Sequence, residues 1–160
     1  MVIPADLSQP LRLERIVSAD LATYEDLVSA RFEAIDLHGP EATMYARVDG
    51  LLPGVFPPND RATALAAVHS RSLRDGSAIV GDTMVTGPAD TEGRDLSVPP
   101  EYIRLWLVAR SFKVRKRLDG SDVWVDEGAG YDDVHAAYGA AVRLVRQAST
   151  VREILITKVP

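Results

Sequence analysis

The spacing of hydrophobic and polar positions predicts short strands and helices in the first half of the chain. Apolar residues recur at three- and four-residue steps from Leu21 to Phe32, as on the buried stripe of an amphipathic helix. A second, alanine-rich helix is expected from residue 60 to 68. Extended segments are expected at residues 2–4, 11–17, 34–37, 43–48 and 78–85.

Turn and cap residues punctuate these elements. Asn59 stands where the N-cap of the second helix should be, with Asp60 in its first turn. The pairs Asp49-Gly50 and Asp75-Gly76 are typical of tight turns. The pair Gly81-Asp82 interrupts an apolar extended run, which indicates a bulge or a close backbone approach.

The second half has a simpler pattern. A long extended run at 102–118 reaches the turn pair Asp119-Gly120, and residues 123–125 return from it as a hairpin. Gly128 to Gly130 then leads into a helix from 131 to 148, and a β-branched strand at 151–159 follows. The predicted order is strand, strand, helix, strand.

Together these elements predict an α+β protein. A chain of 160 residues fits one domain, or two small ones that share a core. We expect a small mixed sheet with two helices in residues 1–90 and a linker at 91–100, which overlaps the Gly- and charge-rich stretch 87–98. A β-hairpin–helix–strand module in 101–160 should pack against the first module.

The composition of the chain limits which partners and which cellular compartment we expect for the protein. The net charge of −5 disfavours a protein that coats nucleic acid, and 46% hydrophobic residues are ordinary for a globular protein. Cysteine is absent, which excludes disulfides and thiolate chemistry and suits a reducing compartment. No apolar run approaches the roughly 18 residues of a membrane span, so we expect a soluble protein of the bacterial cytoplasm with no membrane partner.

Motifs for catalysis, metal or cofactor are missing. The histidines His38, His69 and His135 do not share a metal-binding spacing, and no serine elbow, phosphate loop or dinucleotide fingerprint is present. We therefore expect no metal and no cofactor, and an enzyme is the minority interpretation. A small hydrolase or transferase would regain support if His69 or His135 lay beside a carboxylate in a cleft.

The first strand of the predicted hairpin is rich in basic residues, although the chain as a whole has a negative net charge. Alternation should place Lys113, Arg115 and Arg117 on one face of the strand and apolar residues on the other. This face is a candidate for contacting an anion. The alternative is a solvated strand whose charges discourage edge-to-edge pairing.

Four segments of the first half resemble, in order and spacing, domain-of-unknown-function family 3846. They are Val2–Asp6, Phe32–Leu37, Asn59–Leu65 and Ile79–Gly87, and the resemblance covers about the first 90 residues. The sequence departs from the family pattern at Ser29-Ala30, where a glycine pair would be expected.

The resemblance implies an accessory protein of phages and plasmids with no accepted reaction. It also suggests a ligand-binding surface at Asn59, Arg61, Thr63, Gly81 and Asp82. In that hypothesis the N-terminus of the second helix faces the glycine-aspartate segment and binds an anion, with Arg61 adding charge. The alternative is that these residues only cap, bond and bend the local backbone.

Two functional hypotheses follow. The first is a non-enzymatic protein of a mobile element that captures a small anionic, nucleotide-type ligand to counter or modulate host defence. The second is an interaction module that docks a host protein or a second copy of itself through a sheet edge, forming a homo-oligomer. Binding of duplex DNA through the basic strand ranks last.

Overall fold

A four-stranded sheet forms the centre of the first half of the chain. The computed structural model describes residues 1–16, 21–28, 31–47, 56–70, 77–147 and 149–159. The strands lie in the order β1–β4–β3–β2, with bounds β1 (Val2–Ile3), β2 (Phe32–Leu37), β3 (Ala42–Arg47) and β4 (Thr83–Thr86). Every described pair in this sheet is antiparallel, so the sheet is not the mixed one that the sequence predicted.

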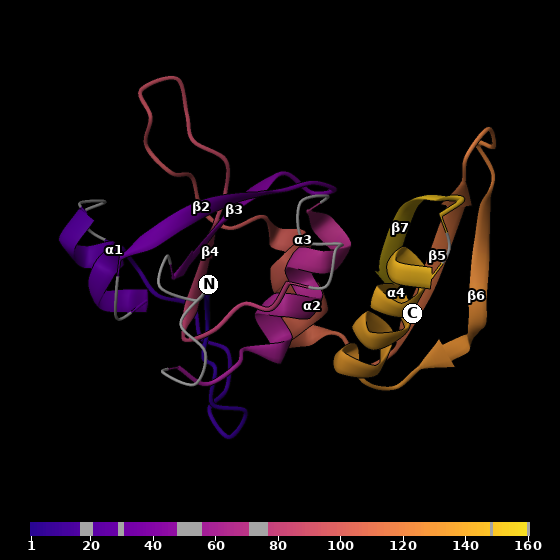
Figure 1. Cartoon of the computed structure of the whole chain (residues 1–160), viewed down its shortest axis with the longest axis horizontal. Coiled ribbons are helices and arrows are strands. Elements are labelled where there is room, and N and C mark those ends of the chain that lie inside the picture. Colours follow the sequence, from indigo (N-terminus) through magenta and orange to yellow (C-terminus); the bar gives the residue numbers. More distant parts are fainter. Residues whose placement is uncertain (17–20, 29–30, 48–55, 71–76, 148, 160) are drawn as a thin grey trace.

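Two helices cover opposite faces of this sheet. Alternation along β4 sends Met84 to the face that packs on helix α1 (Leu21–Val28), and Val85 to the face that packs on helix α2 (Asp60–His69). Figure 1 shows α1 and α2 on either side of the strands. The α1 side holds a small cluster of aromatic rings, and the α2 side belongs to the main core.

The second half forms a separate three-stranded sheet with one helix. The order is β6–β5–β7, with β5 (Phe112–Leu118) central between β6 (Trp124–Tyr131) and β7 (Val151–Lys158). Helix α4 (Val134–Gln147) covers one face, and the Oδ2 atom of Asp133 accepts the main-chain N–H of Ala136 at 2.9 Å as its cap. The predicted hairpin, helix and final strand are confirmed, and so is the α+β class.

Helices α2 and α4 pack against each other and join the two sheets into one core. Leu65 and Ala66 of α2 are fully buried in the same cluster as Tyr138 and Ala141 of α4. Figure 1 shows the layers in the order α1, first sheet, α2, α4, second sheet. The division into modules at 1–90 and 101–160 stays a prediction, because a shared core does not decide where modules begin.

The predicted strand from 102 to 118 is wrong over its first part. Residues Pro100–Ile103 form helix α3, Arg104–Val108 form a π-helical turn η3, and only Phe112–Leu118 is extended. Pro100 occupies the first turn of α3, where its missing N–H does no harm. The π turn is closed by the Ala109 N–H, which donates to the Arg104 carbonyl at 2.8 Å. A short apolar run with β-branched residues can form either a strand or a buried helix, and the sequence pattern alone does not distinguish the two. In this chain the packing of the run against the rest of the fold favours the helix.

Smaller expectations also need correction. The segment Gly128–Gly130 belongs to β6 rather than to a loop, and the β5–β6 register shifts between Phe112 and Val114, beside it. In residues 11–16, the described part of the strand expected at 11–17, the pairing is reduced to one bridge between Arg12 and Val2. The turn pairs at 49–50 and 75–76, and the departure at 29–30, lie outside the described residues.

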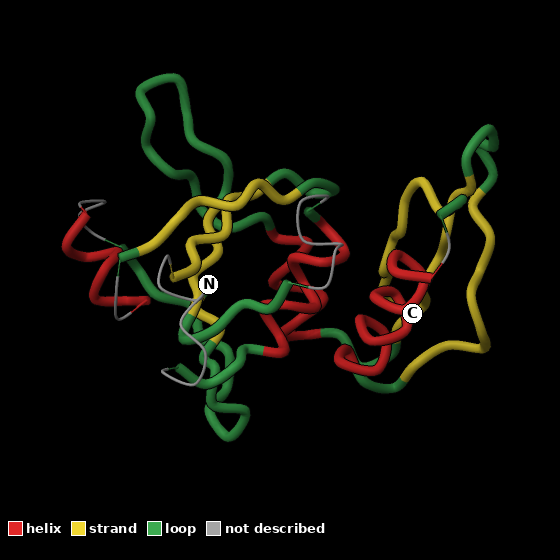
Figure 2. The backbone as a smooth tube through the Cα atoms, in the orientation of Figure 1, coloured by secondary structure: helices red, strands yellow, loops and turns green. Residues whose placement is uncertain are grey.

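A long loop rises between β4 and α3, in the stretch read from the sequence as a linker. Figure 2 shows it projecting beyond the first sheet. Its base is closed by the Gly87 N–H donating to the Leu96 carbonyl at 2.8 Å, and a Cβ at Gly87 would lie 2.5 Å from the Ser97 carbonyl oxygen. The loop is therefore a closed hairpin held at its base. Within the described residues, no helix is long and apolar enough to span a bilayer.

Candidate functional site

Asn59 lies at the junction of three segments and uses every polar atom of its side chain there. It is fully buried; Oδ1 accepts the Ala62 N–H at 3.0 Å, which confirms the predicted N-cap. Nδ2 donates to the carbonyls of Ile3 and Gly81, both at 2.9 Å. Asn59 thus ties the start of α2 to the first strand and to the glycine before β4.

Thr63 and Asp82 are also bonded to main-chain groups. The Thr63 hydroxyl accepts the Ile79 N–H at 2.9 Å, and the Asp82 carboxylate accepts the Ala5 N–H at 2.9 Å. Gly81 between them has a φ of +70°, and a Cβ there would lie 2.5 Å from the Arg47 side chain. The sequence predicted a bulge or a close approach at Gly81-Asp82 inside an extended run; the pair instead precedes β4, and the Arg47 side chain approaches Gly81 closely.

Arg61 faces a different direction from the other members of the predicted set. Its Nη2 donates to the Pro4 and Asp6 carbonyls, both at 2.7 Å, and its Nη1 donates to the Gln9 carbonyl at 2.9 Å. The side chain is 4% exposed, and burial lowers its pKa, opposed by the charges of Asp6 and of Asp82. The structure brings Asn59, Thr63, Gly81 and Asp82 together but holds the guanidinium on the loop at residues 4–9. Their ligand-binding role stays a prediction.

The basic residues of β5 are matched by carboxylates. Lys113 and Arg115 both contact Asp126 of β6, at 2.7 and 3.0 Å, and Arg117 pairs with Glu153 of β7. These contacts hold the pKa of Asp126 below its usual range, chiefly through the Lys113 hydrogen bond. The interpretation of β5 as a protected edge strand is wrong, because β5 pairs with a strand on both sides. Its role as an anion contact stays a prediction.

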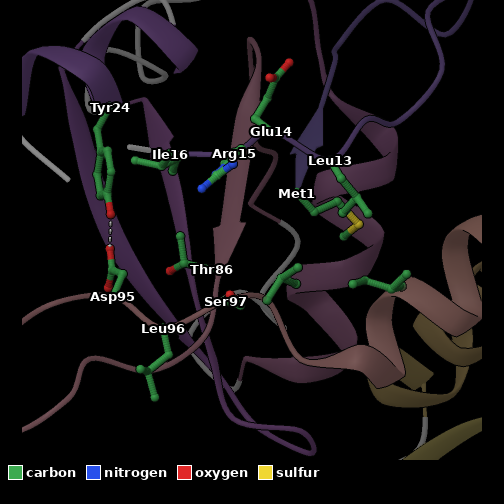
Figure 3. Close-up of a pocket in the computed structure, with 12 residues that line it drawn as sticks. Met1, Leu13, Glu14, Arg15, Ile16, Tyr24, Thr86, Asp95, Leu96 and Ser97 are labelled. Carbon is green, nitrogen blue, oxygen red and sulfur yellow. Dashed lines mark hydrogen bonds between the residues drawn. The ribbon is translucent and has the colours of Figure 1, made fainter. Parts of the chain in front are cut away.

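A hollow of about 470 Å³ opens on the α1 side of the first sheet. Its walls come from the segment before α1, from α1 itself, from the end of β4 and from the base of the loop at 87–98. Figure 3 shows the side chains that surround it. The residues that carry its polar chemistry are Glu14, Arg15, Tyr24, Thr86, Asp95 and Ser97.

Asp95 is the fixed polar group of this pocket. Its Oδ2 accepts the hydroxyls of Tyr24 and Tyr45, both at 2.7 Å, and Figure 3 shows the Tyr24 bond as a dashed line. Burial raises the pKa of both tyrosines, and the Asp95 carboxylate raises it further, so both remain neutral donors. The two bonds anchor the loop on α1 and β3. Within the described residues, no hydrogen bond is made to the second carboxylate oxygen, Oδ1.

Arg15 supplies the cation of the pocket. Glu14, its neighbour, is paired with Arg12 at 2.8 Å, whereas Arg15 has no ion pair among the residues that the structure describes. Among the described residues, the lining therefore presents a guanidinium without an ion pair, that of Arg15, and a carboxylate that holds two tyrosines, that of Asp95. Such a pair can bind an anion at one end and a hydroxyl or amino group at the other.

Sequence reasoning did not find this pocket. Tyr24 lies on the apolar stripe of the first predicted helix, Tyr45 lies in the extended segment predicted at 43–48, and Asp95 lies in the stretch taken as a linker. The tyrosines are 71 and 50 positions from Asp95, so no local spacing links them. The only signal was an aspartate among the alternating charges of residues 87–98.

Comparison with known proteins gives one match. The model of a family described as a domain of unknown function, DUF3846, matches residues 1–113, which extends past the first 90 residues that the sequence resemblance covered. No curated protein and no solved structure matches the chain. The matched span contains the whole first sheet, helices α1, α2 and α3, and every residue of the pocket. This chain belongs to the DUF3846 family.

Proposed function

We propose that this protein is a non-enzymatic binding protein that captures a small phosphorylated, nucleotide-type ligand in the pocket of Arg15 and Asp95. The observation that carries the proposal is the unpaired Arg15 guanidinium on the wall of a hollow whose other polar anchor is a preorganised carboxylate. Its volume of about 470 Å³ lies in the range of small-molecule pockets.

The two charged groups suit the two ends of a nucleotide. A phosphate accepts hydrogen bonds from a guanidinium in a bidentate geometry, which favours arginine at such sites. The Oδ1 atom of Asp95 can accept a ribose hydroxyl or an amino group, while Oδ2 stays on the tyrosines. Because those tyrosines fix the carboxylate before the ligand arrives, less conformational entropy is lost on binding.

Calorimetric titration with nucleoside monophosphates and with cyclic mono- and dinucleotides tests the proposal. At least one should bind, and the matching nucleoside without phosphate should bind much more weakly. Arg15→Ala should weaken binding at least tenfold, or about 1.4 kcal/mol. Arg110→Ala is the matched control, since it removes an exposed arginine that does not line the pocket. Failure of every nucleotide, or equal binding by Arg15→Ala, would refute the proposal.

The same proposal includes a biological setting. Family resemblance suggests an accessory protein of a phage or plasmid, and a nucleotide signal of host defence in the bacterial cytoplasm is the ligand class that fits the pocket. Expression in a bacterium that carries nucleotide-signalled defence should raise phage plating, and Arg15→Ala should abolish that effect. An equal increase from both proteins would exclude nucleotide capture as its cause.

A second candidate function rests on exposed apolar side chains at the tip of the second sheet. Leu118, Val123 and Val125 are 36%, 67% and 45% exposed beside the turn that joins β5 to β6, an outer strand of that sheet. Such a tip suits an interaction with a host protein or a second copy. Light scattering after size exclusion should then show a dimer that Val123→Lys dissociates, and a monomer would argue against self-association.

A further inference from the structure

A second hollow, of about 490 Å³, lies between helices α2 and α4. We call it the interhelical cleft. It is lined by Leu7, Asp60, Arg61, Ala64, His135 and Gly139. None of these residues lines the pocket proposed above for nucleotides, so the two hollows are separate candidates.

Gly139 is the first unexplained feature of the cleft. It lies inside α4, where glycine is a poor helix former, and its backbone has no positive φ that would require glycine. The nearest atom to a Cβ built there is Nη1 of Arg143, at 3.8 Å, which is an ordinary contact. Packing within the chain therefore does not demand a glycine. Its effect is to leave bare helix backbone on the wall of the cleft.

Arg61 is the second unexplained feature of the cleft. Although it is 4% exposed, its partners are main-chain carbonyls, its Nε is buried without an acceptor, and no carboxylate pairs with it among the described residues. Buried charges are ordinarily paired, because an uncompensated ion in a protein interior is destabilising. The wall of the cleft thus carries a guanidinium that is held by main-chain carbonyls, with the charges of Asp6 and Asp82 acting on it but with no carboxylate in direct contact among the described residues.

The remaining walls define what else the cleft can accept. His135 lies edge-on to the ring of Trp106, with centroids 5.5 Å apart, and gives the cleft a flat aromatic side. Leu7 and Ala64 are apolar. Asp60, at the start of α2, is the acidic group among the described residues of the lining, so the wall carries both a donor for an anion and an acceptor for an amino or hydroxyl group.

We propose that the interhelical cleft binds a flat aromatic carboxylate that carries an amino or hydroxyl group. The ring lies against the bare backbone at Gly139 and beside the imidazole of His135. The carboxylate faces the positive charge of Arg61, and the donor group faces Asp60. A glycine with no packing role and a buried guanidinium with no carboxylate are thereby explained by one ligand.

Titration of the amide spectrum of the ¹⁵N-labelled full chain with 4-aminobenzoate tests this site. Amides of residues 60–64 and 135–139 should shift together and saturate, and the uncharged 4-aminobenzamide should shift them much less. Gly139→Leu, which adds a large side chain to the wall of the cleft and leaves the residue at position 61 unchanged, should weaken binding at least tenfold. Gly139→Ala, the fold control, should keep a native spectrum.

Each outcome of the titration either supports or overturns the proposed site in the interhelical cleft. Saturable shifts in the cleft that Gly139→Leu removes support the site, provided that Arg15→Ala leaves them unchanged. The absence of shifts up to millimolar 4-aminobenzoate, shifts that Gly139→Leu leaves intact, or equal binding of the amide would overturn it. Because Arg15→Ala reports only on the nucleotide pocket, failure at one site is distinguishable from failure at the other.

Discussion

Asn59→Asp isolates what the buried asparagine contributes, because it keeps the shape of the side chain. The introduced carboxylate still has one oxygen to accept the Ala62 N–H, so the helix cap survives. The other oxygen, however, replaces the amide that donates to the Ile3 and Gly81 carbonyls at 2.9 Å. Two hydrogen bonds become two repulsive oxygen contacts in a site with no solvent exposure.

The expected loss is a large share of the stability of the fold. The loss of the Nδ2 donor costs about 1–3 kcal/mol at each of the two carbonyls, of which the Gly81 carbonyl keeps a long hydrogen bond, 3.5 Å, from the Thr83 hydroxyl. The interaction of a negative N-cap group with the helix dipole offsets about 0.5–1 kcal/mol of this loss. The net destabilisation should therefore be about 1–5 kcal/mol, against a total of about 5–15 kcal/mol for a typical domain. Asn59→Ser, which keeps an acceptor and adds no charge, should be less damaging at pH 7.

The assay is urea unfolding followed by circular dichroism at pH 7 and at pH 5. Burial beside two carbonyls should raise the pKa of the introduced carboxyl in the folded state above its unfolded value. The folded state then binds more protons than the unfolded state, so stability falls as pH rises through the folded pKa and is partly regained at pH 5. A variant within about 1 kcal/mol of the wild type at pH 7, or one that weakens on acidification, would refute the role given to Asn59.

Three further substitutions test other parts of the structure. Gly139→Ala should raise the free energy of unfolding by up to about 1 kcal/mol in the same urea assay, since a helix interior prefers alanine and space is present. Gly81→Ala should lower it by at least about 1–2 kcal/mol, because its φ of +70° strains any L residue; an unchanged midpoint would contradict that geometry. Tyr24→Phe and Tyr45→Phe should each cost about 1 kcal/mol, and the double variant should cost more than their sum, because Asp95 then loses both donors. Simple additivity of these two effects would mean that the tyrosines do not share the carboxylate.

Local chemistry was readable from the sequence, and long-range pairing was not. The N-cap at Asn59 was predictable because the N–H that it accepts, that of Ala62, lies only three residues further on. The β5–β6 hairpin was predictable because its turn pair lies in the short segment between the two strands. The helix at Pro100–Ile103 was missed because aromatic and β-branched residues outweighed the proline signal at its start.

The contacts of the candidate site were likewise not predictable, because they join residues that lie far apart in the sequence. Asp95 meets Tyr24 and Tyr45 only after the loop at 87–98 folds back on the sheet, and no pattern in one sequence reports that meeting. The direction of Arg61 was also hidden, since its helix position fixes a face but the loop at residues 4–9 decides what covers the guanidinium. The residue type of Arg61 indicated a contact with an anion. Tertiary packing determined that its guanidinium already donates hydrogen bonds to main-chain carbonyls.

The shared core has a consequence for how the DUF3846 domain is handled as a fragment. The family match ends at Lys113, two residues into β5, while both partners of that strand and helix α4 follow it. A fragment cut at this point would carry an unpaired strand stub and would expose the face of α2 that Tyr138 and Ala141 cover in the intact chain. We expect such a fragment to aggregate, so the corresponding domain of a relative should be produced together with the next helix that can cover α2.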